Sequence, residues 1–139
     1  MIELLEAIAL RLHEAGIGRF DPEGVDGNIF IGYMPKSPTE AIAIYPSEGL
    51  ADDLWNDTLR PAVQIMTRGN GDVRVALKMA DNVYNELQGM HNENLGDVYV
   101  VSCVANTYSP VQLGQDNQGR FECAYTFRME IMKGVNQWQ

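Results

Sequence analysis

Residues 119–133 read GRFECAYTFRMEIMK, and this stretch decides the fold. Apolar side chains occupy every second position of it, and mostly polar residues lie between them; the apolar set is Phe121, Cys123, Tyr125, Phe127, Met129 and Ile131. Side chains alternate between the two faces of a β-strand, so a period of two predicts a long strand with one apolar face. An α-helix would instead distribute the same residues around its axis.

The residues upstream extend this strand into a long antiparallel hairpin. Residues 98–105 form a second apolar run, rich in the β-branched residues that strands favour. Residues 110–120 carry the Pro, Gly, Asn and Asp that are typical of a turn. If the hairpin is symmetric about Leu113, Cys103 and Cys123 lie opposite each other on one face. We interpret both as reduced thiols that act as small hydrophobic core residues.

Two amphipathic helices and three shorter strands precede the hairpin. The first helix covers residues 2–15, has its apolar face at Leu4, Leu5, Ile8, Ala9 and Leu12, and ends at Gly16 and Gly18. The second begins at an N-cap, Asp72, continues with apolar residues at helical spacing (Val73, Ala76, Leu77, Ala80, Val83, Tyr84 and Leu87) and ends at Gly89. Strands are predicted over residues 28–33, 40–45 and 61–68, the second of them stopped by Pro46.

This order of elements predicts an α+β fold. We expect one mostly antiparallel or mixed sheet of about five strands, with both helices packed on one face. We expect residues 1–133 to form a single domain and residues 134–139 to form a short C-terminal tail. Residues 47–60 are predicted to be a long acidic loop, which either covers the core locally or contacts another chain.

Both faces of the predicted hairpin are apolar. Tyr99, Val101 and Cys103 are expected on one side of their strand, and Val98, Val100 and Val104 on the other. Helices on one face of a sheet cannot cover both sides. Either the chain wraps around the sheet, or another subunit covers the second face.

The composition disfavours several classes of function. The chain has 139 residues, 45% of them hydrophobic, and a formal net charge of −9 with a pI near 4.5. Such an acidic protein is poorly suited to gripping nucleic acid, because binding to phosphates needs clustered Lys and Arg. No window approaches the ~20 apolar residues that span a bilayer, and Glu3 and Glu6 stand where a signal peptide would carry positive charge.

No motif in the sequence predicts catalysis, a cofactor or a metal ion. His13 and His91 have no partner at a metal-ligand spacing, and the acidic residues of 21–27 do not match an EF-hand loop. Gly69-Asn70-Gly71 follows a strand and opens a helix, as in a dinucleotide-binding loop, but Arg74 replaces the third glycine. Asp72 would also place a negative charge where a phosphate binds. We therefore interpret this segment as a turn with a helix cap.

Four segments, in this order, carry a family resemblance. They are the opening amphipathic helix, Gly27-Asn28-Ile29-Phe30-Ile31-Gly32, Arg60-Pro61-Ala62-Val63-Gln64-Ile65 leading to Arg68-Gly69, and Leu113-Gly114-x-Asp116-x-x-Gly119-Arg120. Over nearly the whole chain this pattern resembles the tail-terminator, or minor capsid, proteins of long-tailed bacteriophages, which join the tail to the head. None of the four segments is a catalytic signature.

The resemblance implies a structural protein of the virion that is not an enzyme and has no cofactor. Proteins similar to this one form homo-oligomeric, commonly hexameric, rings that cap the tail tube and dock to the head connector. The implied partners are further copies of the chain, the tail tube protein and the connector, with DNA passing through the acidic lumen without specific binding and no membrane involved. The candidate subunit or partner contacts are Asp52, Asp53, Trp55, Leu113, Asp116, Arg120 and Trp138, within residues 47–60, residues 106–120 and the C-terminal tail.

Two other interpretations stay open at this point. The first is another neck or head-completion protein of the same particle. The second, from a different functional class, is a small-ligand-binding protein or enzyme that uses the turn at residues 69–72.

Overall fold

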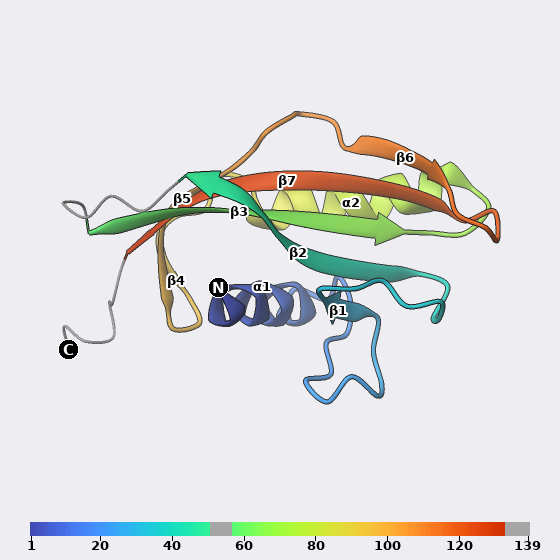
Figure 1. The fold of residues 1–139 in the computed structure, drawn as a ribbon, viewed down its shortest axis with the longest axis horizontal. Coiled ribbons are helices and arrows are strands. Elements are labelled where there is room, and N and C mark those ends of the chain that lie inside the picture. Colours follow the sequence, from blue (N-terminus) through green and yellow to red (C-terminus); the bar gives the residue numbers. More distant parts are fainter. Residues whose placement is uncertain (51–56, 133–139) are drawn as a thin grey trace.

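The chain folds into an α+β structure with two helices and a curled mixed sheet, which confirms the predicted class. The computed structural model of the protein describes residues 1–50 and 57–132 (Figure 1). The elements are α1 (Ile2–Glu14), β1 (Ile29–Ile31), β2 (Ala41–Leu50), β3 (Thr58–Arg68), α2 (Val73–Leu87), β4 (His91–Leu95), β5 (Val98–Ala105), β6 (Val111–Gln115) and β7 (Phe121–Met132). The sheet of the described residues thus has seven strands instead of about five.

Strand β7 is the centre of the sheet. Along the sheet the order is β1-β2-β3-β7-β5-β4, and β6 pairs with β7 as well. Among the strand pairs of residues 1–50 and 57–132, only β1 and β2 run parallel; the other pairs are antiparallel. The alternating pattern of β7 is confirmed, since Cys123, Tyr125, Phe127, Met129 and Ile131 are all buried in the core. The strand that decides the fold therefore contacts partners along both of its edges.

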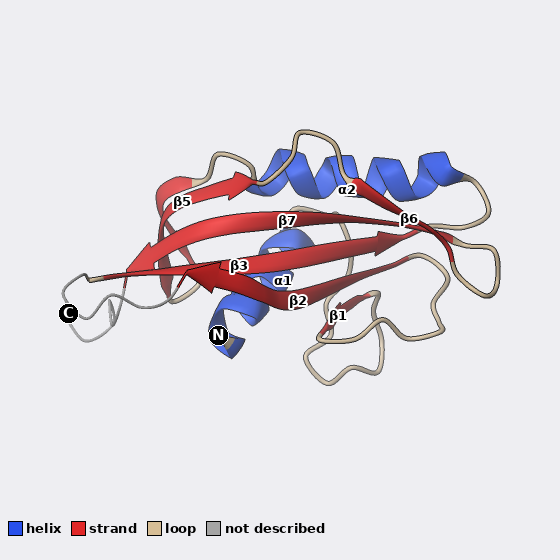
Figure 2. Cartoon of the chain, turned by 45° about the horizontal axis from the view of Figure 1, so that its top comes forward, coloured by secondary structure: helices blue, strands red, loops and turns tan. Residues whose placement is uncertain are grey.

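The two helices share one core but cover different parts of the curled sheet. α2 packs on β3, β7 and β5, whereas α1 packs on β1, β2, β4 and β5 (Figure 2). The prediction that both helices pack on one face of the sheet was therefore imprecise. The predicted helical faces are confirmed: the five residues predicted for the apolar face of α1 are all buried, and Ala76, Ala80, Val83 and Leu87 of α2 are buried too. The other three predicted residues of the α2 face, Val73, Leu77 and Tyr84, are half-buried.

Strand β2 is longer than predicted. It continues through Pro46 to Leu50, and β3 begins at Thr58, so part of the predicted loop over residues 47–60 is strand. Proline is tolerated because β1 pairs only with Ile42–Ile44 of β2, which leaves the edge of β2 at Pro46 without a strand neighbour in the described chain. Strands β4 and β6 were not predicted at all.

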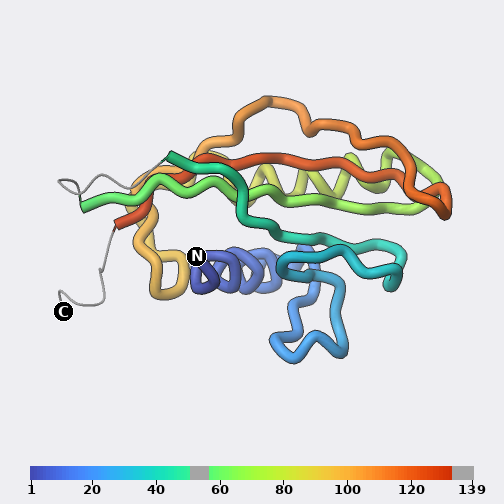
Figure 3. Tube along the Cα trace, viewed as in Figure 1, coloured from blue at the N-terminus to red at the C-terminus, as the bar shows by residue number. Residues whose placement is uncertain are grey.

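The predicted register of the final hairpin was wrong. The turn lies at residues 116–119, because Gln115 pairs with Phe121, and the Asp116 amide donates to the Arg120 carbonyl. Between β5 and β6 the chain leaves the sheet and returns to it (Figure 3). These extra residues shift the pairing, so Cys103 lies opposite Met129 and Cys123 lies opposite Gln112 and Thr67. The two cysteines are not a cross-strand pair.

An irregularity in β5 corrects the predicted faces of that strand. The register with β7 shifts between Val100 and Ser102. A bulge of this kind changes which side chains face the core. Val100 and Cys103 are therefore both buried, although strict alternation had placed them on opposite faces.

Candidate functional site

The groups that a catalytic or metal site would need are dispersed. Within residues 1–50 and 57–132, no three His, Cys, Asp or Glu side chains group closely enough to hold a metal ion. Nδ1 of His13 accepts the Phe20 amide at 3.0 Å, and Nδ1 of His91 lies 3.0 Å from the Gly89 carbonyl oxygen. Both imidazoles thus contribute to local loop structure.

Burial makes both cysteine thiols unreactive. Cys103 and Cys123 are buried in the core. Burial raises the pKa of Cys103 to about 12, and it also raises the pKa of Cys123. A thiol rather than a thiolate is present at neutral pH, and the thiol is a poor nucleophile. Both residues therefore act as small apolar side chains.

The turn at residues 69–72 is closed by its own side chains. The Asp72 carboxylate accepts the Arg74 amide at 3.0 Å and forms an ion pair with the Arg74 guanidinium at 2.8 Å. The Asn70 side-chain oxygen accepts the Asp72 amide at 2.8 Å. A carboxylate thus occupies the first turn of α2, where a phosphate would have to bind. The geometry is that of a helix cap, as the sequence predicted.

The tip of the final hairpin is organised by Asp116 and Arg120. The Asp116 carboxylate accepts the amides of Gln118 and Arg120, both at 2.9 Å, and Nε of Arg120 at 2.8 Å. The hydrogen bond from the Arg120 amide is the main cause that lowers the pKa of Asp116. The tip is therefore a preformed unit in which a buried arginine and a partly buried aspartate hold the turn.

Two buried arginines attach this tip to the segment before β2. Nη1 of Arg120 donates to the Lys36 carbonyl at 2.6 Å. Arg68, at the end of β3, donates to the carbonyls of Pro38 (2.6 Å) and Thr39 (3.0 Å). Burial and the nearby Arg120 charge lower the pKa of Arg68. Two of the four segments that carry the family resemblance, those around Arg68 and Arg120, thus lie close together in space. Their arginines hold residues 36–39 by hydrogen bonds.

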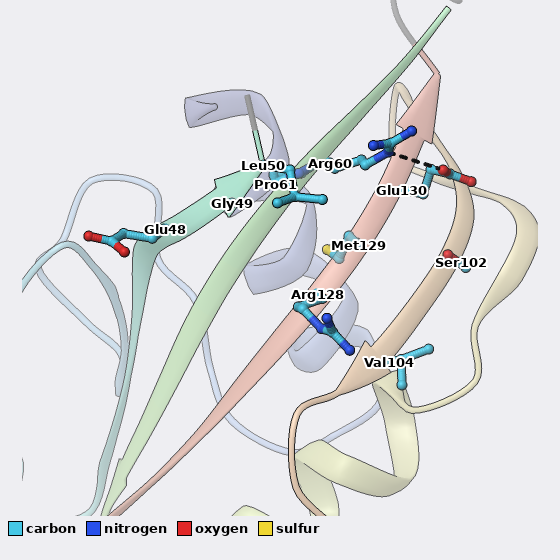
Figure 4. A pocket seen from close by; sticks show the side chains of 10 residues that line it. All are labelled: Glu48, Gly49, Leu50, Arg60, Pro61, Ser102, Val104, Arg128, Met129 and Glu130. Atoms are coloured by element: carbon cyan, nitrogen blue, oxygen red, sulfur yellow. Dashed lines mark ion pairs between the residues drawn. The ribbon is translucent and has the colours of Figure 1, made fainter. Parts of the chain in front are cut away.

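A groove of about 510 Å³ crosses the open face of the sheet (Figure 4). It is lined by residues of β2, β3, β5 and β7: Glu48, Gly49, Leu50, Arg60, Pro61, Ser102, Val104, Arg128, Met129 and Glu130. Two carboxylates balance two guanidiniums, and Nε of Arg60 lies 3.7 Å from Oε1 of Glu130. Among the described residues, the lining has no histidine or cysteine beside its one hydroxyl. A neutral, partly apolar groove of this kind suits contact with another protein surface.

Exposed hydrophobic side chains gather along β6 and the segment before it. Tyr108, Val111 and Leu113, which we call the edge patch, are exposed by 85%, 54% and 45%. Residues 98–115 contain no charged side chain, in a chain that is 21% charged. Sheet edges that face solvent are normally protected by charges. This uncharged run was the sequence signal that could have identified the edge patch, of which only Leu113 was predicted.

The predicted contact residues fall into three groups. Leu113 is exposed on β6. Asp116 and Arg120 lie together at the hairpin tip, where their side chains bind each other. Asp52, Asp53, Trp55 and Trp138 lie outside the described residues. Arg68 and Tyr108 were not predicted.

Comparisons with known proteins identify the family of this chain. Among solved structures, a chain described as "Virion of native gene transfer agent (GTA) particle" has the same fold, with a TM-score of 0.69 over 93% of this chain and 94% of that chain, at 14% sequence identity. No curated protein sequence matches this chain. None of the helices in the described chain is long and apolar enough to cross a membrane. A model of the family described as "Bacteriophage tail terminator protein" matches residues 11–133. The chain therefore belongs to the bacteriophage tail terminator family and is a structural protein of the virion.

Proposed function

We propose that this protein forms a homo-oligomeric ring, most simply a hexamer, that terminates the tail tube and joins it to the head connector. The observation that carries the proposal is the family match over residues 11–133. The structure supports a mechanical rather than a catalytic role. The buried polar residues of the described chain hold the fold together, and its exposed surface carries a neutral groove and an uncharged sheet edge that suit contact with other proteins.

The charge distribution supports a DNA channel through the ring. Residues 1–26 and the β4 region with its turn contain Glu3, Glu6, Glu14, Asp21, Glu23, Asp26, Glu93 and Asp97, against only Arg11 and Arg19. These segments lie on the same side of the molecule, around α1 (Figure 1). A surface of one charge repels the phosphates of DNA. We propose that this α1 side faces the lumen and lets DNA pass without binding it.

The arginine clamp supports a docking role for the hairpin tip. The turn at residues 116–119 is ordered by these contacts before any partner binds, so binding costs little conformational entropy in this turn. We propose that this tip, with Leu113, Asp116 and Arg120, lies at the contact with the tail tube, the connector or a neighbouring subunit. Asp52, Asp53, Trp55 and Trp138 remain predicted contacts.

Removing the gene from its phage tests the proposal. A protein that caps the tube stops its growth, so its loss should give tubes of uncontrolled length and heads without tails, both visible by negative-stain electron microscopy. Expression of the wild-type chain from a plasmid should restore tails of uniform length. Tails of normal length beside defective heads would instead identify a head-completion protein.

The oligomeric state provides a second test. Native mass spectrometry of the purified full chain, and of tails that carry it, should show a closed ring of one stoichiometry. A monomer in both samples would refute the ring.

A further inference from the structure

The edge patch has no covering element within the described part of the chain, and an apolar hollow lies at the other end of the same sheet. We propose that the edge patch of one copy docks into this end hollow of the next copy, so that subunits associate head to tail. The inference rests on the proposed ring and names the surfaces that would build it.

A hydrogen bond, a ring contact and strand pairing connect the edge patch to the rest of the fold. The Tyr125 hydroxyl donates to the Tyr108 carbonyl at 2.8 Å, and the Tyr108 ring meets the Tyr84 ring edge-on with centroids 6.1 Å apart. Strand β6, which carries Val111 and Leu113, is hydrogen-bonded to β7. Side chains that are ordered beforehand lose little conformational entropy on binding, and rigid tyrosines are favoured at interface centres.

The end hollow has a volume of about 540 Å³ and is mostly apolar. It is lined by Met1, Leu4, Ser47, Gly49, Leu50, Leu59, Arg60, Pro61 and Ile131. Leu50, at the end of β2, is 67% exposed, and Met1 is 53% exposed. Large apolar side chains exposed around a hollow favour contact with an apolar protrusion.

The two surfaces are far apart on one subunit. Val111 of the edge patch pairs with Ala124 near the start of β7, whereas Leu59 of the hollow pairs with Ile131 near its end. Seven residues of extended strand separate these positions by roughly 23 Å. Figure 1 shows β6 and the end of β2 toward opposite ends of the sheet. Two different patches that bind each other give a head-to-tail contact, which generates a ring when the rotation closes.

The charge of the chain favours a second copy of the protein as the partner of the edge patch. Each chain carries a formal net charge of −9, so two copies repel each other unless their contact surfaces are uncharged. The edge patch lies within the uncharged run of residues 98–115. A basic partner would select acidic residues at its docking surface, and this run has none. The apolar hollow of the same chain is the matching surface that the described structure offers.

Cross-linking of cysteine variants tests the contact directly. Leu113→Cys places a thiol in the edge patch, and Leu50→Cys places one at the hollow, while the native Cys103 and Cys123 are buried. The full-length variants are mixed at equal concentration, as purified protein and on assembled tails, and treated with a short bis-maleimide. We expect a cross-linked dimer in the mixture but in neither variant alone.

The outcomes separate this inference from the proposed function. Rings on native mass spectra without the mixed cross-link would overturn the head-to-tail contact and leave the ring intact. A cross-link of Leu113→Cys with itself would show a two-fold contact instead and would also overturn the inference. Monomers in both samples would show that the proposed ring itself has failed.

A matched pair of charged variants measures the strength of the contact. Leu113→Asp should weaken self-association by about 100-fold, because a charge would be buried at an apolar interface centre. Leu10→Asp is the control, since Leu10 is exposed to the same degree, 44% against 45%. Raising the salt concentration should strengthen wild-type association, because it screens repulsion between acidic subunits. Equal loss in both variants, or association that weakens with salt, would contradict a neutral contact between copies.

Discussion

Replacing Arg120 by alanine should destabilise the protein strongly, although the residue lies in a turn. The variant removes the ion pair with Asp116 and the hydrogen bond to the Lys36 carbonyl. A hydrogen bond made by a charged group contributes about 1.5–3 kcal/mol. Water can reach the Asp116 carboxylate, whose side chain is 20% exposed, and will offset part of the loss. We therefore expect the free energy of unfolding to fall by about 2–4 kcal/mol.

The chain contains a natural control for this variant. Arg74 and Asp72 also form an ion pair at 2.8 Å, but the Arg74 side chain is 86% exposed, compared with 9% for Arg120. Exposed ion pairs contribute little to stability, because water and salt screen them. The Asp72 carboxylate would also keep its hydrogen bond from the residue 74 amide after Arg74→Ala.

Thermal unfolding followed by circular dichroism measures both variants. A loss of about 3 kcal/mol corresponds to a fall in Tm of about 10 °C for a domain of this size. We expect such a fall for Arg120→Ala and almost none for Arg74→Ala. Equal Tm values for the two variants would refute the reasoning that burial of the guanidinium holds the hairpin tip.

Three further predictions test other features of the fold. Asp116→Asn should lower the free energy of unfolding at pH 7 and should flatten the decline of that free energy below about pH 4. The reason is that a carboxylate with a lowered pKa stabilises the fold above its unfolded-state pKa and loses this effect as the pH falls through its folded-state pKa. Urea unfolding of the wild type and the variant across this pH range measures the difference, and parallel curves of free energy against pH would contradict the prediction. Gly69→Ala should cost about 1–3 kcal/mol, because a Cβ would lie 2.6 Å from the Ala76 nitrogen, whereas Gly71→Ala, with its nearest atom at 4.0 Å, should be nearly neutral. Cys103 should resist a thiol reagent at pH 8 until the protein unfolds, and unfolding should become easier as pH rises from 9.0 toward 12, since its folded-state pKa is raised; fast labelling of the folded protein would refute this.

The elements with a clear period were predictable from the sequence. β7 alternates over its whole length because one face packs on the helices, and α1 and α2 show apolar stripes for the same reason. The cap at Asp72 was predictable because it depends only on residues close in sequence. Contacts between residues close in sequence, and burial that repeats with a regular period, can both be predicted from one amino-acid sequence.

The missed elements lack a period of their own. β4 reads HNENL and has one buried residue, and β6 reads VQLGQ and has none. These strands exist because a neighbouring strand presents an edge to them, which is a tertiary effect. The predicted register of the hairpin was wrong for a similar reason: residues 106–110 leave the sheet, and no local sequence pattern shows how many residues do so.

The candidate site was predictable only in part. The segment that contains Leu113, Asp116 and Arg120 was found from the resemblance, but the meeting of Arg120 with residues 36–39 joins positions 84 apart in sequence. Arg68 belongs to one of the four segments that carry the resemblance, but the sequence predicts no role for it, because its two carbonyl partners lie about 30 residues away in the chain. Long-range polar contacts of this kind leave no periodic trace in a sequence.

The central position of β7 has a consequence for how the protein is made. The strand that joins β3 to β5 and β6 follows every other described strand in the sequence, so the sheet cannot close until translation has passed Met132. A nascent chain halted before that point would display unpaired β3 and β5 edges, which chaperones and proteases recognise. A closed sheet, and the surfaces that depend on it, therefore exist only after residues 121–132 have been added to the chain.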